Sequence, residues 1–216
     1  MSLVQACWRG QKNPLQSASD PCIGITENMN VVASLYLRAK RWQVFVLFFG
    51  TFVFAQVAFV ASIFGTSRSP ENSLKVGLPV WMAIVLSTFC ILGWFWALGL
   101  FLNSIVVPPL RLRVGLFRFA LLYPALYIVL FMAFFGSTNP LLFAVIVPLH
   151  LLAMFCMFYC LYFVSKSLVL AETGKPASFS DYAGPFFLMW FYPLGVWFIQ
   201  PRVNRLYAGR NSQQAF

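Results

Sequence analysis

The chain has 216 residues, of which 61% are hydrophobic and only 9% are charged. A typical soluble domain is about 25% charged, so this composition excludes an ordinary water-soluble fold and indicates an integral membrane protein. The formal net charge is +10, which in a membrane protein indicates cytoplasmic loops rich in Lys and Arg rather than a nucleic-acid surface. We therefore expect membrane lipids, anionic ones in particular, and no nucleic acid among its partners.

Residues 1–41 are mixed and polar, and they predict a cytoplasmic N-terminal segment. The apolar core of a secretory signal would lie much nearer Met1, so this segment is not one. Its last part, Asn30–Arg41, has two interpretations. It is either a short interfacial helix that leads into the bilayer or an ordinary solvated lead-in.

The first two membrane spans are expected at about 42–64 and 78–107, because both ranges are uncharged. One crossing needs about 20 apolar residues, so each range is long enough for one helix. Pro108 and Pro109 end the second helix, since neither has an N–H donor and a proline disfavours helix at the residue before it.

The longest uncharged stretch, Phe119–Ser165, has 47 residues and predicts two more spans. The turn-forming residues Gly136–Pro140 divide it. We therefore expect helices at about 119–135 and 141–164, joined by a tight hairpin. The second of them continues past the membrane surface through Glu172, before a stop that contains glycine and proline.

A last apolar stretch, residues 182–201, is long enough for a fifth crossing but is interrupted by prolines and glycines. With four spans and both termini cytoplasmic, 13 basic residues lie inside and 2 outside, whereas a fifth crossing would make these numbers 10 and 5. The positive-inside rule favours the first topology. We therefore predict that this stretch bends at Pro193–Gly195 and is re-entrant or interfacial.

The predicted fold is all-α. A four-transmembrane-helix bundle occupies residues 42–171, and residues 172–216 form a cytoplasm-facing segment that combines the re-entrant or interfacial stretch with a basic tail.

The predicted spans contain no Asp, Glu, Lys or Arg. Ion-coupled transport usually places acidic residues within the membrane, and no residues have metal-ligand spacing, so we expect no cofactor and no metal. The candidate intramembrane polar residues are His150, Gln56 and Tyr127. His150 could be a haem ligand, a proton shuttle or a general base. We predict instead a neutral imidazole that bonds across helices to Gln56, Tyr123, Tyr127 or a backbone carbonyl.

A basic cluster near the C-terminus predicts a more specific site. The candidate ligands are Lys166, Gln200, Arg202, Asn204 and Arg205. If the last apolar stretch turns back, these groups meet at the cytoplasmic surface, where they can bind a lipid phosphate. Arg202 and Arg205 lie about one helical turn apart and could instead hold Glu172 or Asp181. Anchoring of the chain by cations at the membrane edge is the third interpretation.

The string Phe187–Asn204 (FLMWFYPLGVWFIQPRVN) resembles the C-terminal string of a group of small bacterial multi-pass inner-membrane proteins. The resemblance covers under a fifth of the chain and implies no activity. What it implies is a location, the bacterial inner membrane.

Because the sequence contains no catalytic constellation, we predict a non-enzymatic membrane component that acts by helix-mediated association. It would be a homo-oligomer, with or without a pore, or an accessory subunit of a larger membrane complex. A pore needs a polar lining, and the polar residues of the spans are few: Gln56, Ser87, Thr88, Asn103 and His150. The alternative is a membrane enzyme that binds or modifies lipid headgroups with the basic cluster.

Overall fold

The computed structural model describes residues 31–65, 71–134 and 140–214, and nearly all of them are helical. Four helices in this part of the chain are long and apolar enough to cross a membrane. They are α3 (Arg41–Gly65), α4 (Glu71–Ile105), α5 (Val114–Phe134) and α6 (Pro140–Thr173). The shorter elements are α2 (Val31–Arg38), the 3-10 turn η2 (Pro108–Leu110), α7 (Phe179–Trp190) and α8 (Tyr192–Gln214). The predicted all-α, four-helix membrane fold is confirmed.

Two helix starts differ from the sequence prediction. Helix α4 begins at Glu71, although the apolar span within it begins at Val80, close to the predicted residue 78. Helix α5 begins at Val114 instead of near residue 119. An uncharged run predicts which residues lie inside the bilayer. It does not predict where the helix begins, because a helix can extend beyond the bilayer into water. The predicted end of α6 is confirmed, because Gly174 adopts a positive φ of 64° there and its N–H donates to the carbonyl of Leu170.

The connection between α4 and α5 is short and is held by side-chain hydrogen bonds to the backbone. The side chain of Asn103 pairs with the backbone of Leu112 in both directions, at 3.1 Å and 2.9 Å. The Arg111 guanidinium donates to the carbonyls of Ser104 (3.0 Å) and Val106 (2.9 Å). A cation at the C-terminus of a helix satisfies carbonyls that lack a partner and complements the helix dipole, so this end of α4 is stabilised.

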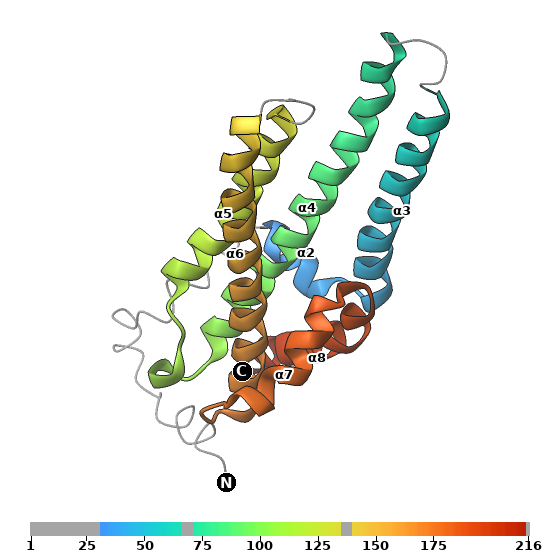
Figure 1. Ribbon diagram of the computed structural model, residues 1–216. Helices are drawn as coiled ribbons and strands as arrows, with labels where there is room; N and C mark the ends of the chain where they lie inside the picture. Colours follow the sequence, from blue (N-terminus) through green and yellow to red (C-terminus); the bar gives the residue numbers. More distant parts are fainter. Residues whose placement is uncertain (1–30, 66–70, 135–139, 215–216) are drawn as a thin grey trace.

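The four long helices form two antiparallel hairpins, α3–α4 and α5–α6, which Figure 1 shows diverging from a common base. We call the base the packed end, where α4 ends, α5 begins and α6 ends, and the opposite end the open end. Packing at the base is tight. The rings of Phe117 and Phe163 stack at 4.2 Å, and a Cβ at Gly99 would lie 2.4 Å from the Phe117 ring.

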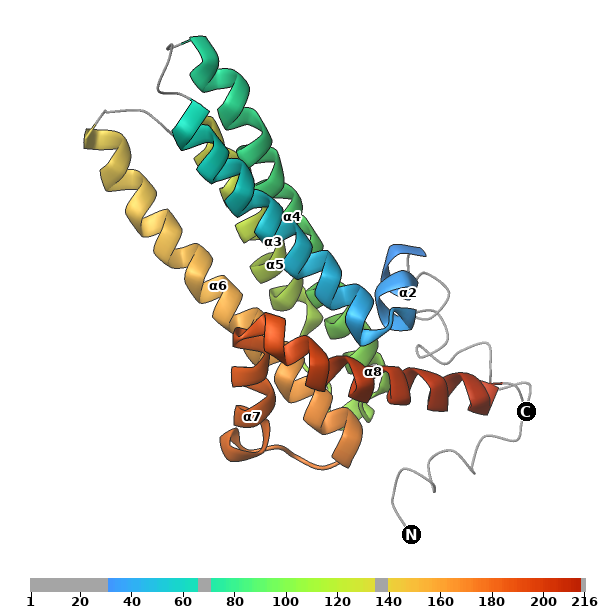
Figure 2. The same cartoon turned by 90° about the vertical axis from the view of Figure 1, so that its right-hand side faces the viewer.

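Helices α2, α7 and α8 gather at the packed end, with α8 running across the long helices (Figure 2). Neither α7 nor α8 is among the candidate membrane spans, and the re-entrant or interfacial character of this stretch stays a prediction. The chain turns at Phe191, slightly before the predicted bend at Pro193–Gly195. Gly195 permits the turn, because a Cβ there would lie 1.8 Å from the carbonyl oxygen of Leu188.

The short helix predicted as one alternative for Asn30–Arg41 is present as α2, within the described part of that range. Tyr36 lies against Gly93 of α4 and donates to the carbonyl of Cys90 at 3.1 Å. Residues 1–30 lie outside the described residues, and so does the predicted turn Gly136–Pro140 except for Pro140, which begins α6.

Candidate functional site

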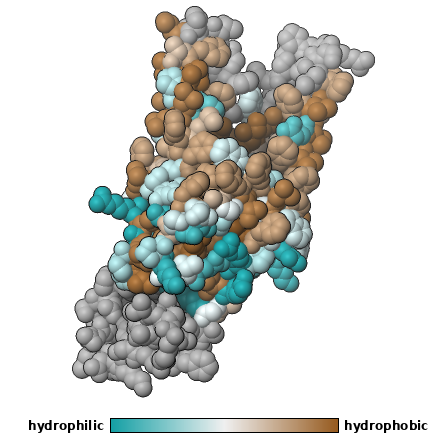
Figure 3. All heavy atoms as spheres, turned by 60° about the horizontal axis from the view of Figure 1, so that its bottom comes forward, coloured by the Kyte–Doolittle hydropathy of each residue, from teal (hydrophilic) through white to brown (hydrophobic). Residues whose placement is uncertain are grey.

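Positive charge is concentrated at the packed end. Of the basic residues that the structure describes, Lys75 alone is placed on the open end. The others are Arg38, Lys40, Arg41, Arg111, Arg113, Arg118, Lys166, Lys175, Arg202, Arg205 and Arg210. Figure 3 views the molecule from this side, and hydrophilic residues gather there while apolar residues cover the two arms beyond. This is the distribution that the positive-inside rule associates with a cytoplasmic face.

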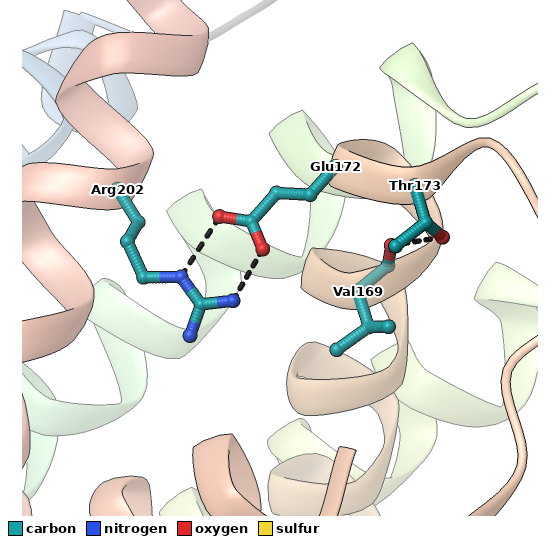
Figure 4. Close-up of polar contacts among 4 residues, drawn as sticks. All are labelled: Val169, Glu172, Thr173 and Arg202. Atoms are coloured by element: carbon teal, nitrogen blue, oxygen red, sulfur yellow. Dashed lines mark hydrogen bonds and ion pairs between the residues drawn. The ribbon is translucent and has the colours of Figure 1, made fainter. Parts of the chain in front are cut away.

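Arg202 forms an ion pair with Glu172, one of the two acidic residues predicted as its possible partners. The guanidinium makes a bidentate pair with the Glu172 carboxylate, with Nε to Oε1 at 2.8 Å and Nη2 to Oε2 (Figure 4). This bond raises the pKa of Arg202 above its usual value. Because both planar groups are occupied, the pair ties the end of α6 to α8 and leaves Arg202 poorly placed to hold a lipid phosphate.

Gln200 and Asn204 belong to the protein interior and not to a phosphate site. Gln200 is fully buried. Its side-chain oxygen Oε1 accepts from Trp94 Nε1 at 3.0 Å. Its side-chain nitrogen Nε2 donates to the backbone carbonyls of Tyr36 (2.9 Å) and Ala39 (3.2 Å) and to Asn204 Oδ1 (3.0 Å). Asn204 in turn donates to the Ala39 carbonyl at 3.2 Å. We therefore withdraw both residues from the candidate phosphate ligands. They connect α8 with α4 and with the junction between α2 and α3.

The remaining members of the predicted cluster are separated. Arg205 is exposed and has no bonded partner among the described residues. Asp181 does not meet an arginine. Its carboxylate accepts from the backbone N–H of Ser178 (2.8 Å) and from the Ser178 hydroxyl (2.7 Å) at the start of α7. These hydrogen bonds lower the pKa of Asp181. Lys166 lies on α6 against the aromatic rings of Tyr162 and Tyr182.

Three cations at the packed end lie close to aromatic rings. Arg41 lies 5.4 Å from the centre of the Trp197 ring, and Arg118 lies 5.9 Å from that of Trp96. Lys166 Nζ lies 5.2 Å from the ring centre of Tyr162. Aromatic and cationic side chains are both enriched at the level of lipid headgroups. Such pairs are therefore typical of the level at which one surface of a bilayer would meet the bundle.

A groove of about 410 Å³ lies between α4, α5 and α6, and residues on either side of the α7–α8 turn also line it. Its walls are mostly apolar and include Phe95, Met154, Met157, Phe158, Trp190 and Tyr192. The polar residue of α4 that faces it, Thr88, donates to its own helix at the carbonyl of Ile84, 2.9 Å away. The groove therefore suits an apolar occupant better than a polar one.

His150 and Tyr127 form the polar part of the groove wall. Tyr127 Oη lies 3.1 Å from His150 Nδ1, and the two rings lie 5.6 Å apart. Tyr127 is one of the hydrogen-bond partners predicted for His150 from the sequence. Gln56 is not part of this pair, because it is exposed on α3, which does not line the groove.

The described residues contain no group of three His, Cys, Asp or Glu side chains that could hold a metal ion. What they do bring together is an apolar groove, one His–Tyr pair and a lysine among aromatic rings. Comparisons of the chain with protein-family models, curated proteins and solved structures give no match.

Proposed function

We propose that the protein is a non-enzymatic component of the bacterial inner membrane that acts by lateral association, with a second copy of itself as partner. Both termini face the cytoplasm in this proposal. The concentration of basic residues at the packed end, where α8 also lies, supports that orientation.

The observation that carries the proposal is the position of Gln56. It is exposed on α3 and has no hydrogen-bond partner among the described residues. Fifteen residues separate it from Arg41, a distance of about 22 Å along the helix axis. If Arg41 lies at the bilayer surface, Gln56 is within the hydrocarbon core, which is about 30 Å thick. A primary amide in that place is costly unless it is hydrogen-bonded.

A second copy of the chain is the simplest partner for this amide. A glutamine side chain is both donor and acceptor, so two Gln56 side chains related by a two-fold axis can satisfy each other in an isologous interface. The surrounding surface of α3 is apolar and exposed at Phe49, Phe52, Val53 and Val60. Apolar side chains there can pack against the same residues of the second copy.

The proposal is tested by Förster transfer between donor-labelled and acceptor-labelled copies in phosphatidylcholine vesicles. Gln56→Leu should weaken association at least about sevenfold, since two reciprocal bonds are lost at about 0.6–2 kcal/mol each. Gln56→Asn keeps an amide and should retain much of the transfer. Thr51→Val is the matched control, because Thr51 is on the side of α3 that faces Ser87 of α4. Wild-type transfer in Gln56→Leu would refute the proposal.

A pore within one copy has less support, because the polar residues of the spans do not follow a common path. Asn103 is bound to the α4–α5 connection, Ser87 lies between α3 and α4, and Thr88 bonds to its own helix. The alternative of a lipid-modifying enzyme is also weakened, because three of its five candidate ligands, Gln200, Arg202 and Asn204, are bound within the protein.

A further inference from the structure

A row of aromatic residues leads from the groove between α4, α5 and α6, which we call the α4–α6 groove, to the packed end. Phe158 and Trp190, which line the groove, have ring centres 4.5 Å apart. One turn further along α6, Tyr162 meets Tyr182 of α7 edge-on at 5.5 Å. One turn beyond that is Lys166. The row therefore connects an apolar space with a cation along one face of α6.

Lys166 is left without an acidic partner in the part of the chain that the structure describes. Its Nζ donates to Tyr162 Oη at 3.0 Å and lies 5.2 Å and 5.9 Å from the ring centres of Tyr162 and Tyr182. Glu172 is occupied by Arg202, and Asp181 by Ser178. A lysine ammonium has three N–H donors, so Lys166 retains both its charge and donors for an external anion.

We propose that an anionic phospholipid binds here, with an acyl chain in the α4–α6 groove and its headgroup phosphate on Lys166. The charge of Lys166 matches the phosphate, and the apolar walls match the chain. The groove volume of about 410 Å³ lies within the range of roughly 300–1,000 Å³ that is usual for ligand pockets. The proposal uses neither Gln56 nor self-association, so it goes beyond the function proposed above.

The spacing along α6 also fits a lipid. Phe158 and Lys166 are eight residues apart, which is about 12 Å along the helix axis. Side chains on a helix point towards its N-terminus, and the bond to Tyr162 places the Lys166 ammonium back over the aromatic row. An acyl chain in the groove and a phosphate on Lys166 can therefore belong to one molecule, whose glycerol region passes Tyr162.

The test uses Trp190, which lines the groove, as a reporter. The protein is placed in phosphatidylcholine nanodiscs that contain a minor fraction of phosphatidylglycerol with brominated acyl chains, which quench tryptophan fluorescence. Quenching in the wild type minus quenching in Trp190→Phe isolates the Trp190 signal. We expect this signal to exceed that from an equal fraction of brominated phosphatidylcholine. Lys166→Gln should reduce the excess about fivefold, the effect of one cation near an anionic headgroup.

Two further variants separate this site from a general attraction to the basic surface. Arg205→Gln removes an exposed cation at the same end of the protein and should leave the excess unchanged. Ile128→Phe adds bulk to the groove from α5 and should lower the excess while Lys166 is intact. Equal excess in Lys166→Gln and wild type would overturn the proposal. So would an equal loss in Arg205→Gln, which would mean a delocalised surface charge, or no effect of Ile128→Phe.

Discussion

Replacing Gln200 tests whether one buried amide holds the packed end together. Gln200→Leu keeps a side chain of similar size and removes all four hydrogen bonds of the amide. Three groups then lose the partner that the structure gives them: Trp94 Nε1, the Tyr36 carbonyl and Asn204 Oδ1, the last of which belongs to a partly exposed residue. The Ala39 carbonyl keeps a donor, because Asn204 Nδ2 also reaches it at 3.2 Å.

The expected loss is worked from Trp94 Nε1 and the Tyr36 carbonyl, because Asn204 is partly exposed. Leaving a buried donor or acceptor unsatisfied costs about 1–3 kcal/mol, so Gln200→Leu should lower the free energy of unfolding by about 2–6 kcal/mol. That is a large part of the total for a typical domain, which is about 5–15 kcal/mol. Gln200 is fully buried, so lipid and water have no direct access to replace the lost bonds.

Unfolding can be followed by tryptophan fluorescence while sodium dodecyl sulfate is titrated into protein in a mild detergent. At protein concentrations at which the chain is monomeric, Gln56→Leu is the matched control, because it makes the same chemical change at an exposed position and should not destabilise the monomer. Trp94→Phe removes the donor to Gln200, so Gln200→Leu should cost about 1–3 kcal/mol less in that background. A Gln200→Leu variant within about 0.5 kcal/mol of wild type, the range usual for surface changes, would refute the reasoning.

Three other predictions concern the C-terminal elements. Gly195→Ala should prevent the α7–α8 turn from closing, because the new Cβ would lie 1.8 Å from the Leu188 carbonyl oxygen, and limited proteolysis should then cut within α7 or α8. The pKa of Asp181 is lowered in the folded protein by its bonds to Ser178. Ionised Asp181 therefore stabilises the start of α7 at pH values above the unfolded pKa of Asp181, and this stabilisation is lost as the pH falls through the folded pKa. Hydrogen exchange of the α7 amides can measure the loss. Ser212→Cys should be shielded from an impermeant thiol reagent in intact cells, and labelling would contradict the proposed orientation.

The membrane spans were predictable because a charged side chain is costly in the bilayer interior. Runs without charge, such as Phe119–Ser165, therefore predict where helices cross. The same principle does not predict where helices end. Lys75 and Arg118 interrupt or bound uncharged runs, yet both lie inside helices, α4 and α5. Nothing in water requires a helix to stop at a charge.

The candidate phosphate site was less predictable, because neighbours in sequence point to different sides of a helix. Gln200 and Asn204 are four residues apart and share a face of α8, and this is the buried face that also carries Val196 and Val203. Arg205 is one residue beyond Asn204 and is exposed. The spacing of Val196, Gln200 and Val203 by three and four residues could have indicated that Gln200 faces the core.

The position of a tryptophan within the uncharged run did not predict its surroundings in α4. Both Trp94 and Trp96 lie well inside the uncharged run, but they have different surroundings. Trp94 is fully buried and donates to Gln200, whereas the ring of Trp96 makes a cation–π contact with Arg118. Helix α8, which runs across the packed end (Figure 2), supplies the hydrogen-bond acceptor for Trp94. Such a long-range contact has no local pattern in the sequence.

The two proposals use different sides of the α3–α4 hairpin, and so they fail independently. Ser87 of α4 lies 3.4 Å from Thr51 of α3, whereas the adjacent Thr88 faces the α4–α6 groove. An interface through Gln56 on the outer side of α3 therefore leaves the groove open to the bilayer. Gln56→Leu should weaken association and keep the preference for phosphatidylglycerol, whereas Lys166→Gln should reduce that preference and keep association. If either variant removed both properties, lipid binding and association would be one event, and the separation of these surfaces would be wrong.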